Sequence, residues 1–86
     1  MDLLLQVEGC FAIQGLGLAL SPDLSPPYSE RIAEYSVLVE RPDGTSIAAA
    51  ATARRAHFRL AGYKSVLFLT SVDEEEVPLG SKVWKV

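Results

Sequence analysis

The side chains that most often carry out chemistry are scarce in this chain, which has one histidine, His57, and one cysteine, Cys10. A metal site needs several ligands and a nucleophile needs a neighbouring base, and these two residues supply neither set. The acidic run at residues 73–76 is contiguous, whereas calcium loops alternate their carboxylates around a glycine turn. We therefore expect no enzyme, no metal and no cofactor, and we interpret the acidic run as a solvated corner.

Two glycines, Gly15 and Gly17, follow the apolar run at residues 11–13. A nucleotide-binding loop would add a third glycine or a lysine and would open a helix, and none of these follows. Paired glycines inside a strand pattern are instead typical of a bulge or of a tight bend at the corner of a barrel. The pair is therefore predicted to be structural.

A basic stretch offers the first candidate binding site. Its members are Arg54, Arg55, His57, Arg59, Tyr63 and Lys64. Strand alternation would place Arg55, His57 and Arg59 on one face, and cations beside an exposed aromatic ring are the ingredients of a nucleic-acid contact. A merely solvated strand face is the competing interpretation, and it is favoured because no second basic stretch reinforces the first.

The second candidate is a surface for a protein partner. The segment 21–29 holds three prolines and three serines, which indicates a loop. Pro26, Pro27 and Tyr28 from this loop, with Trp84 on a terminal strand that we expect to be a docking edge, are the predicted contacts. Binding a protein partner or a second copy of the chain is the leading hypothesis, and binding RNA or a ribonucleoprotein through residues 54–64 is the alternative.

The elements that would position these residues are short strands. Tyr35, Val37 and Val39 alternate with polar neighbours, the turn signal at residues 41–44 follows, and residues 45–53 should return as the second arm of a hairpin. A helix over residues 48–55 remains open because alanine is the best helix former. Residues 64–70 form a continuous apolar run, as expected for a core strand. The pattern predicts an all-β fold with six or seven antiparallel strands in a small closed or nearly closed barrel.

Length and composition limit the other possibilities. The 86 residues allow one domain, 1–86, and 49% hydrophobic with 22% charged residues is typical of a globular protein. A formal net charge of −3 argues against a general affinity for phosphate backbones or anionic membranes. The apolar start is too short for a signal peptide or a membrane span, and a lone cysteine asks for no oxidising compartment. A cytoplasmic location is therefore expected.

Two segments carry a resemblance to a known family. Residues 7–17 contain Phe11, Ile13, Gly15 and Gly17 in a Phe-x-Ile-x-Gly-x-Gly pattern, which resembles the opening of the second domain of elongation factor Tu and related translational GTPases. Residues 66–80 are similar to the last strands of that domain. The resemblance implies a translation-protein type β-barrel without catalytic activity, because GTP chemistry there belongs to another domain. Leu16 stands where the family often has a basic residue, so no phosphate contact is implied at that position.

Overall fold

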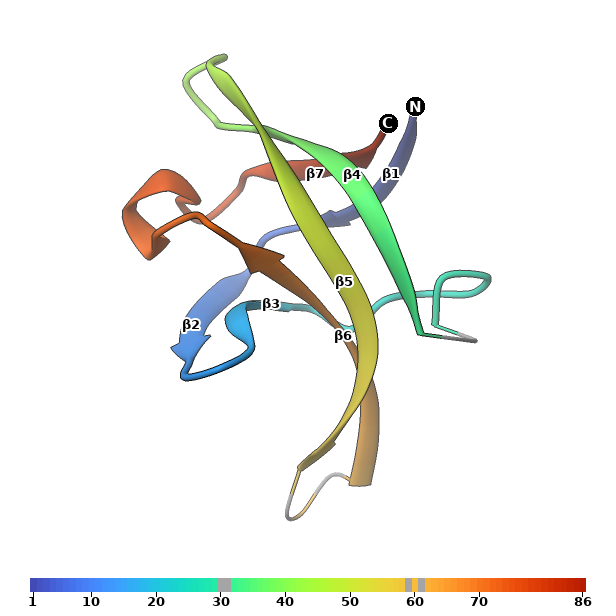
Figure 1. Cartoon of the computed structure of the whole chain (residues 1–86). Helices are drawn as coiled ribbons and strands as arrows, with labels where there is room; N and C mark the ends of the chain where they lie inside the picture. The colour runs from blue at the N-terminus through green and yellow to red at the C-terminus, as the bar shows by residue number, and fades with distance from the viewer. Residues whose placement is uncertain (30–31, 59, 61) are drawn as a thin grey trace.

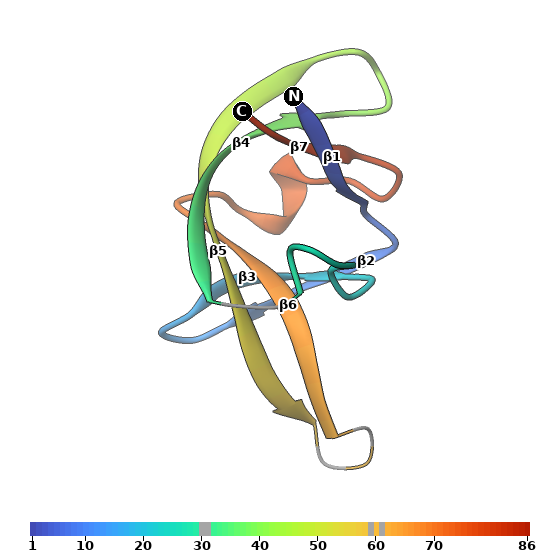
Figure 2. The same cartoon turned by 90° about the vertical axis from the view of Figure 1, so that its right-hand side faces the viewer.

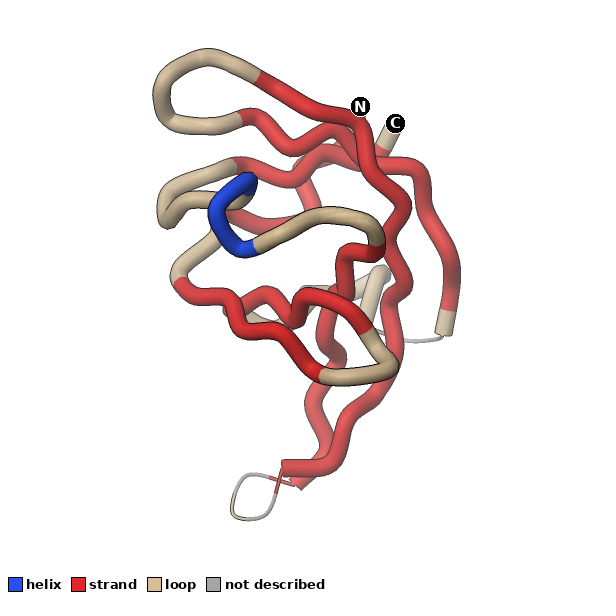
Figure 3. The backbone as a smooth tube through the Cα atoms, turned by 60° about the vertical axis from the view of Figure 1, so that its left-hand side comes forward, coloured by secondary structure: helices blue, strands red, loops and turns tan. Residues whose placement is uncertain are grey.

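A computed structural model describes residues 1–29, 32–58, 60 and 62–86. Within them the chain forms strands joined by turns and one short 3₁₀ turn, drawn in blue in Figure 3. The elements are β1 (Asp2–Gln6), β2 (Gly9–Ile13), β3 (Gly17–Ser21), β4 (Ala33–Glu40), β5 (Ser46–Phe58), β6 (Gly62–Thr70), η1 (Glu74–Glu76) and β7 (Lys82–Lys85). The predicted all-β fold is confirmed.

The alanine-rich segment is a strand, so the alternative of a helix over residues 48–55 is wrong. In β5, Ala51 and Ala53 are buried while Ala48 and Ala50 are exposed, which is the alternation of a strand with one covered face. Antiparallel pairing with β4 on one side and β6 on the other satisfies the backbone of this segment. Tertiary pairing therefore outweighs the helix propensity of alanine.

All strand pairs are antiparallel, and the strand order is β1-β7-β4-β5-β6-β3-β2. The sheet curls into a half-barrel, but it is open, so the predicted closure is corrected (Figure 1). The two edge strands, β1 and β2, are successive segments joined through Val7 and Glu8. Val7 donates its N–H to the carbonyl of Ser81 beside β7, and Glu8 donates to Ser21 of β3. Strands β1 and β2 are therefore consecutive in the chain, but they do not pair with each other, and the sheet stays open.

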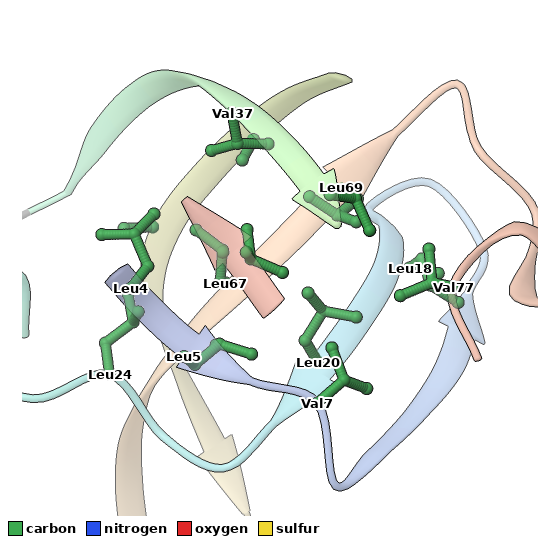
Figure 4. Close-up of a cluster of buried hydrophobic side chains, with 14 residues drawn as sticks. Leu4, Leu5, Val7, Leu18, Leu20, Leu24, Val37, Leu67, Leu69 and Val77 are labelled. Carbon is green, nitrogen blue, oxygen red and sulfur yellow. The ribbon is translucent and has the colours of Figure 1, made fainter. Parts of the chain in front are cut away.

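The main core lies on the concave face of the sheet (Figure 4). Its buried members are Leu4, Leu5, Val7, Leu18, Leu20, Leu24, Val37, Val39, Ala51, Ala53, Leu67, Leu69, Val77 and Val83. A smaller cluster of Ala19, Val66 and Phe68 alternates with core residues of β3 and β6 and so lies on the opposite face. Strand β6 is covered on both faces, as its continuous apolar run predicted.

The predicted turn between β4 and β5 is confirmed. Gly44 donates its N–H to the carbonyl of Arg41, and Arg41 donates to Thr45 across the turn. The Asp43 carboxylate accepts both the N–H and the hydroxyl of Thr45, at 2.9 and 2.6 Å. These bonds lower the pKa of Asp43, with the hydroxyl bond as the largest cause.

Candidate nucleic-acid interface

Strands β5 and β6 continue beyond their neighbours and project from the sheet as a two-stranded ribbon (Figure 2). The last pair between β4 and β5 is Ala33 with Ala53, and the last pair between β3 and β6 is Leu20 with Leu67. Residues 54–58 and 62–66, called the ribbon below, therefore pair only with each other. At its base Ser65 accepts an N–H bond from Leu24 and donates its hydroxyl to Ser29, at 2.9 and 2.8 Å.

The ribbon lies in the longest part of the sequence without an acidic residue. Residues 44–72 contain four of the eight lysines and arginines and none of the eleven acidic residues. Arg54, Arg55, His57 and Lys64 lie on the ribbon itself. Arg59, which we predicted to belong to the same site, falls outside the described residues. The net charge of −3 is thus unevenly distributed along the chain. Residues 44–72 are basic, and the rest of the chain, called the acidic body below, holds all the acidic residues.

The register divides the basic side chains between the two faces of the ribbon. Arg55 is opposite Ser65 and His57 is opposite Tyr63, so these residues share one face, called the tyrosine face below. Arg54 and Lys64 alternate with them and lie on the other face. The predicted placement of Arg55 and His57 on a common face is confirmed, whereas the six predicted residues do not form one continuous surface.

The tyrosine face holds an aromatic pair. The rings of Tyr63 and His57 are 4.9 Å apart between centroids with an interplanar angle of 63°, an edge-to-face contact. Such contacts fix ring orientation and contribute beyond area burial. Tyr63 nevertheless remains 74% exposed. The pair is therefore an ordered aromatic surface that has no role in the core.

Acidic groups near the ribbon decide whether its charge is available. Asp23 approaches Lys64 with 3.9 Å between carboxylate and ammonium, a long contact between side chains that are 45% and 41% exposed. Glu34 pairs with Thr52, which places it diagonally across from Arg54. Exposed contacts of this kind contribute little and are screened by salt.

Three other carboxylates in the described part of the chain form hydrogen bonds outside the ribbon. Glu40 accepts the indole N–H of Trp84 at 3.1 Å. Glu74 accepts the N–H of Ala12 on β2 at 3.3 Å, and Glu76 accepts the N–H of Asp73 at 3.0 Å. These three carboxylates therefore bond to groups outside the ribbon.

Residues predicted to contact a protein partner occupy two different places. The Tyr28 hydroxyl donates to Asp2 at 3.0 Å, which is the main reason that the pKa of Tyr28 is raised. Its ring packs edge-to-face on Tyr35 at 6.0 Å, and the Lys85 ammonium lies 5.9 Å from its centroid. Tyr28 thus anchors the loop to the sheet, while Pro26 and Pro27 remain exposed.

Trp84 is not on a docking edge, which corrects the prediction. Strand β7 is paired with β1 on one side and β4 on the other, so its backbone is occupied. Trp84 aligns with Leu3 and Leu38 in an apolar row across these strands. Because Trp84 alternates with Lys85, it points to the face opposite to the one that Tyr28 contacts. The structure does not bring the loop and Trp84 together.

The remaining chemical candidates are Cys10 and the acidic run at residues 73–76. Among residues 1–29, 32–58, 60 and 62–86, no three His, Cys, Asp or Glu side chains are grouped as metal ligands. A hollow of about 730 Å³ between the β2–β3 turn and residues 71–75 is open and lined partly by Asp73, Glu74 and Glu75. Cys10 is half-buried, and burial followed by the charge of Glu74 raises its pKa, which keeps the thiol protonated.

No helix in the described part of the chain is both long and apolar enough to cross a membrane. Comparison with protein-family models, curated proteins and solved structures found no match. The resemblance to the second domain of elongation factor Tu therefore stays a hypothesis that rests on residues 7–17 and 66–80.

Proposed function

We propose that this protein is a non-enzymatic binding module that binds RNA through the basic ribbon. The observation that carries the proposal is the projection of residues 54–58 and 62–66 beyond the sheet, in the region that holds half of the lysines and arginines and no acidic residue. Among the ribbon residues whose burial is described, Val66 alone belongs to a buried cluster, so the described core does not account for the projection. Contacts with the phosphate groups of RNA would account for a basic projection of this kind.

The separation of charge explains how an acidic chain can bind a polyanion. At physiological salt the screening length is about 8 Å, so the ligand responds to the charges that it touches and much less to distant ones. The acidic run at η1 contacts β2. Strand β2 is an edge strand of the sheet and is separated from β6 by β3. A translation-protein type of barrel and a cytoplasmic location would both suit this function, and we include them in the proposal.

The salt dependence of RNA binding tests the proposal. A single strand that wraps around the ribbon and contacts one phosphate each at Arg54, Arg55 and Lys64, on both faces, would give a slope of log K against log salt of about −2, which is a loss of about 20-fold between 50 and 200 mM salt. Fluorescence anisotropy with a labelled single-stranded RNA and a labelled hairpin RNA measures this slope. Binding that is absent, or that does not weaken with salt, overturns the proposal.

A matched pair of variants locates the binding surface. Arg54→Gln with Arg55→Gln should reduce the slope to about −0.7, because one phosphate contact remains. Lys82→Gln with Lys85→Gln removes the same charge from β7 and should leave the slope unchanged. If the two double variants lose affinity equally, binding follows net charge and the ribbon is not the site.

A second candidate function is self-association or binding of a protein partner, favoured by the row of Leu3, Trp84 and Leu38. Leu3 is 45% exposed, and Trp84 and Leu38 are partly exposed. Sedimentation velocity tests the self-association form of this idea. A concentration-dependent dimer that Trp84→Ala disperses would support it, whereas a monomer up to about 100 µM, well above typical dimer dissociation constants, would exclude it. Pro26→Ala with Pro27→Ala then tests whether the loop contributes.

A further inference from the structure

The tyrosine face combines an exposed ring, its aromatic partner and a cation two residues from that partner. Tyr63 is 74% exposed, His57 contacts it edge-to-face at 4.9 Å, and Arg55 lies two residues before His57 on the same face. Strands β3 and β4 end before this level, so neither pairs with the outer edges of the ribbon here. The ring is therefore held in one orientation while much of its surface stays open to a ligand.

We propose, in an inference that rests on the proposed function, that Tyr63 stacks an unpaired base of single-stranded RNA and that His57 positions the Tyr63 ring. Stacking on an aromatic ring requires a base whose flat surface is free. Bases in a duplex are already stacked on each other, and the major groove of A-form RNA is too deep and narrow for side chains to read. Arg55, on the same face, is placed to contact the phosphate beside that base.

The shape of the molecule also favours a flexible ligand. Each strand of the ribbon contributes five residues, a length of about 17 Å at the usual rise per residue. A single strand can bend so that its contacts stay within this length. A stiff duplex would extend past the ribbon and bring further phosphates toward the acidic body.

The two cations on the opposite face, Arg54 and Lys64, do not indicate that the ribbon inserts into a groove of duplex RNA. Arg54 lies at the base of the ribbon with Glu34 diagonal to it, and Lys64 lies near Asp23. These neighbours offset part of the positive charge on that face. Arg55 lies on the tyrosine face, on the same side of the ribbon as the exposed ring. A phosphate beside a base stacked on Tyr63 can therefore be contacted by a cation of the same face.

The test compares removal of the ring with removal of the hydroxyl. Tyr63→Ala should weaken binding of a single-stranded RNA by roughly 5- to 150-fold, the usual effect of losing one stacked base, while the salt slope stays unchanged. Tyr63→Phe keeps the ring and should bind like the wild type. Phe11→Ala removes an aromatic ring that is 48% exposed on β2 and should have no effect.

The ligands in the same experiment separate failure of this inference from failure of the proposed function. A single strand carrying 2-aminopurine should show a fluorescence change on binding to wild type and to Tyr63→Phe, but not to Tyr63→Ala. A blunt RNA duplex of the same length should bind more weakly and should not respond to Tyr63→Ala. Salt-dependent binding that is equal for duplex and single strand, or insensitive to Tyr63→Ala, overturns stacking and leaves the proposed function standing. Absence of salt-dependent binding overturns both.

Discussion

Replacing Gly17 by alanine should destabilise the protein far more than the same change at Gly15. Both glycines have positive φ, +84° at Gly15 and +108° at Gly17, and a side chain in a left-handed conformation costs roughly 1–2 kcal/mol. A Cβ at Gly15 would meet nothing within 4 Å, whereas a Cβ at Gly17 would press on the carbonyl oxygen of Leu69. Leu69 pairs with Leu18 between β3 and β6.

Relief of that contact requires the two strands to separate, which weakens ladder hydrogen bonds at about 1 kcal/mol each and disturbs the packing of a fully buried leucine. We expect a loss of about 3–5 kcal/mol for Gly17→Ala and about 1–2 kcal/mol for Gly15→Ala. An 86-residue domain has a total stability of roughly 4–13 kcal/mol, so the first variant should be close to unfolding.

Urea denaturation followed by the fluorescence of Trp84, the single tryptophan, measures both values. Circular dichroism detects a variant that is already unfolded without urea, which is the extreme form of the expected result. A difference of less than about 1 kcal/mol between the two variants, which is within reach of ordinary context effects, would refute the reasoning. It would mean that the close approach of β3 and β6 at Gly17 does not constrain the fold.

Three further predictions concern the core, a turn and the cysteine. Leu67→Ala should cost about 2–5 kcal/mol in the same urea assay, because Leu67 is fully buried, and a smaller loss would contradict its place in the core. Thr45→Val removes the main cause of the lowered Asp43 pKa, so NMR titration should show that pKa rising toward its ordinary value. Because the folded pKa is lowered, this carboxylate stabilises the wild type above its unfolded pKa, and the effect is lost as pH falls through the folded pKa. Cys10 should react with iodoacetamide more slowly than a free thiol at pH 8.5, a pH near the ordinary cysteine pKa, and Glu74→Gln should speed the reaction.

The local pattern of the sequence was sufficient to predict strands and their buried faces. Val37 and Val39 alternate with exposed residues along β4, and the turn residues Asp43 and Gly44 fix where the chain reverses. These features depend on neighbours in sequence, and a period of two reports them directly. The segment 48–55 was ambiguous because alanine fits either structure, and only pairing with β4 and β6 resolves it.

Properties that depend on the relative lengths and order of strands were not accessible from the sequence. Closure depends on which strands become edges, and β7 pairs with both β1 and β4 although it is the last strand of the chain. A terminal position in sequence therefore did not make Trp84 part of an edge. The ribbon exists because β4 starts at Ala33 and β3 ends at Ser21. The sequence of residues 54–66 itself does not show where these two neighbouring strands begin or end. The one available signal was the absence of acidic residues between 44 and 72.

The division between sheet and ribbon gives stability and recognition to different parts of the molecule. Buried apolar residues of the concave core come from every strand except β2, and Val66 is the one member of a buried cluster among the ribbon residues whose burial is described. Substitutions at Arg55, His57 or Tyr63 can therefore change binding with little effect on folding. The same division fixes where a ligand must lie. A polyanion that approached the body would meet the acidic majority of the charges, whereas one that approaches the ribbon meets cations and an exposed ring.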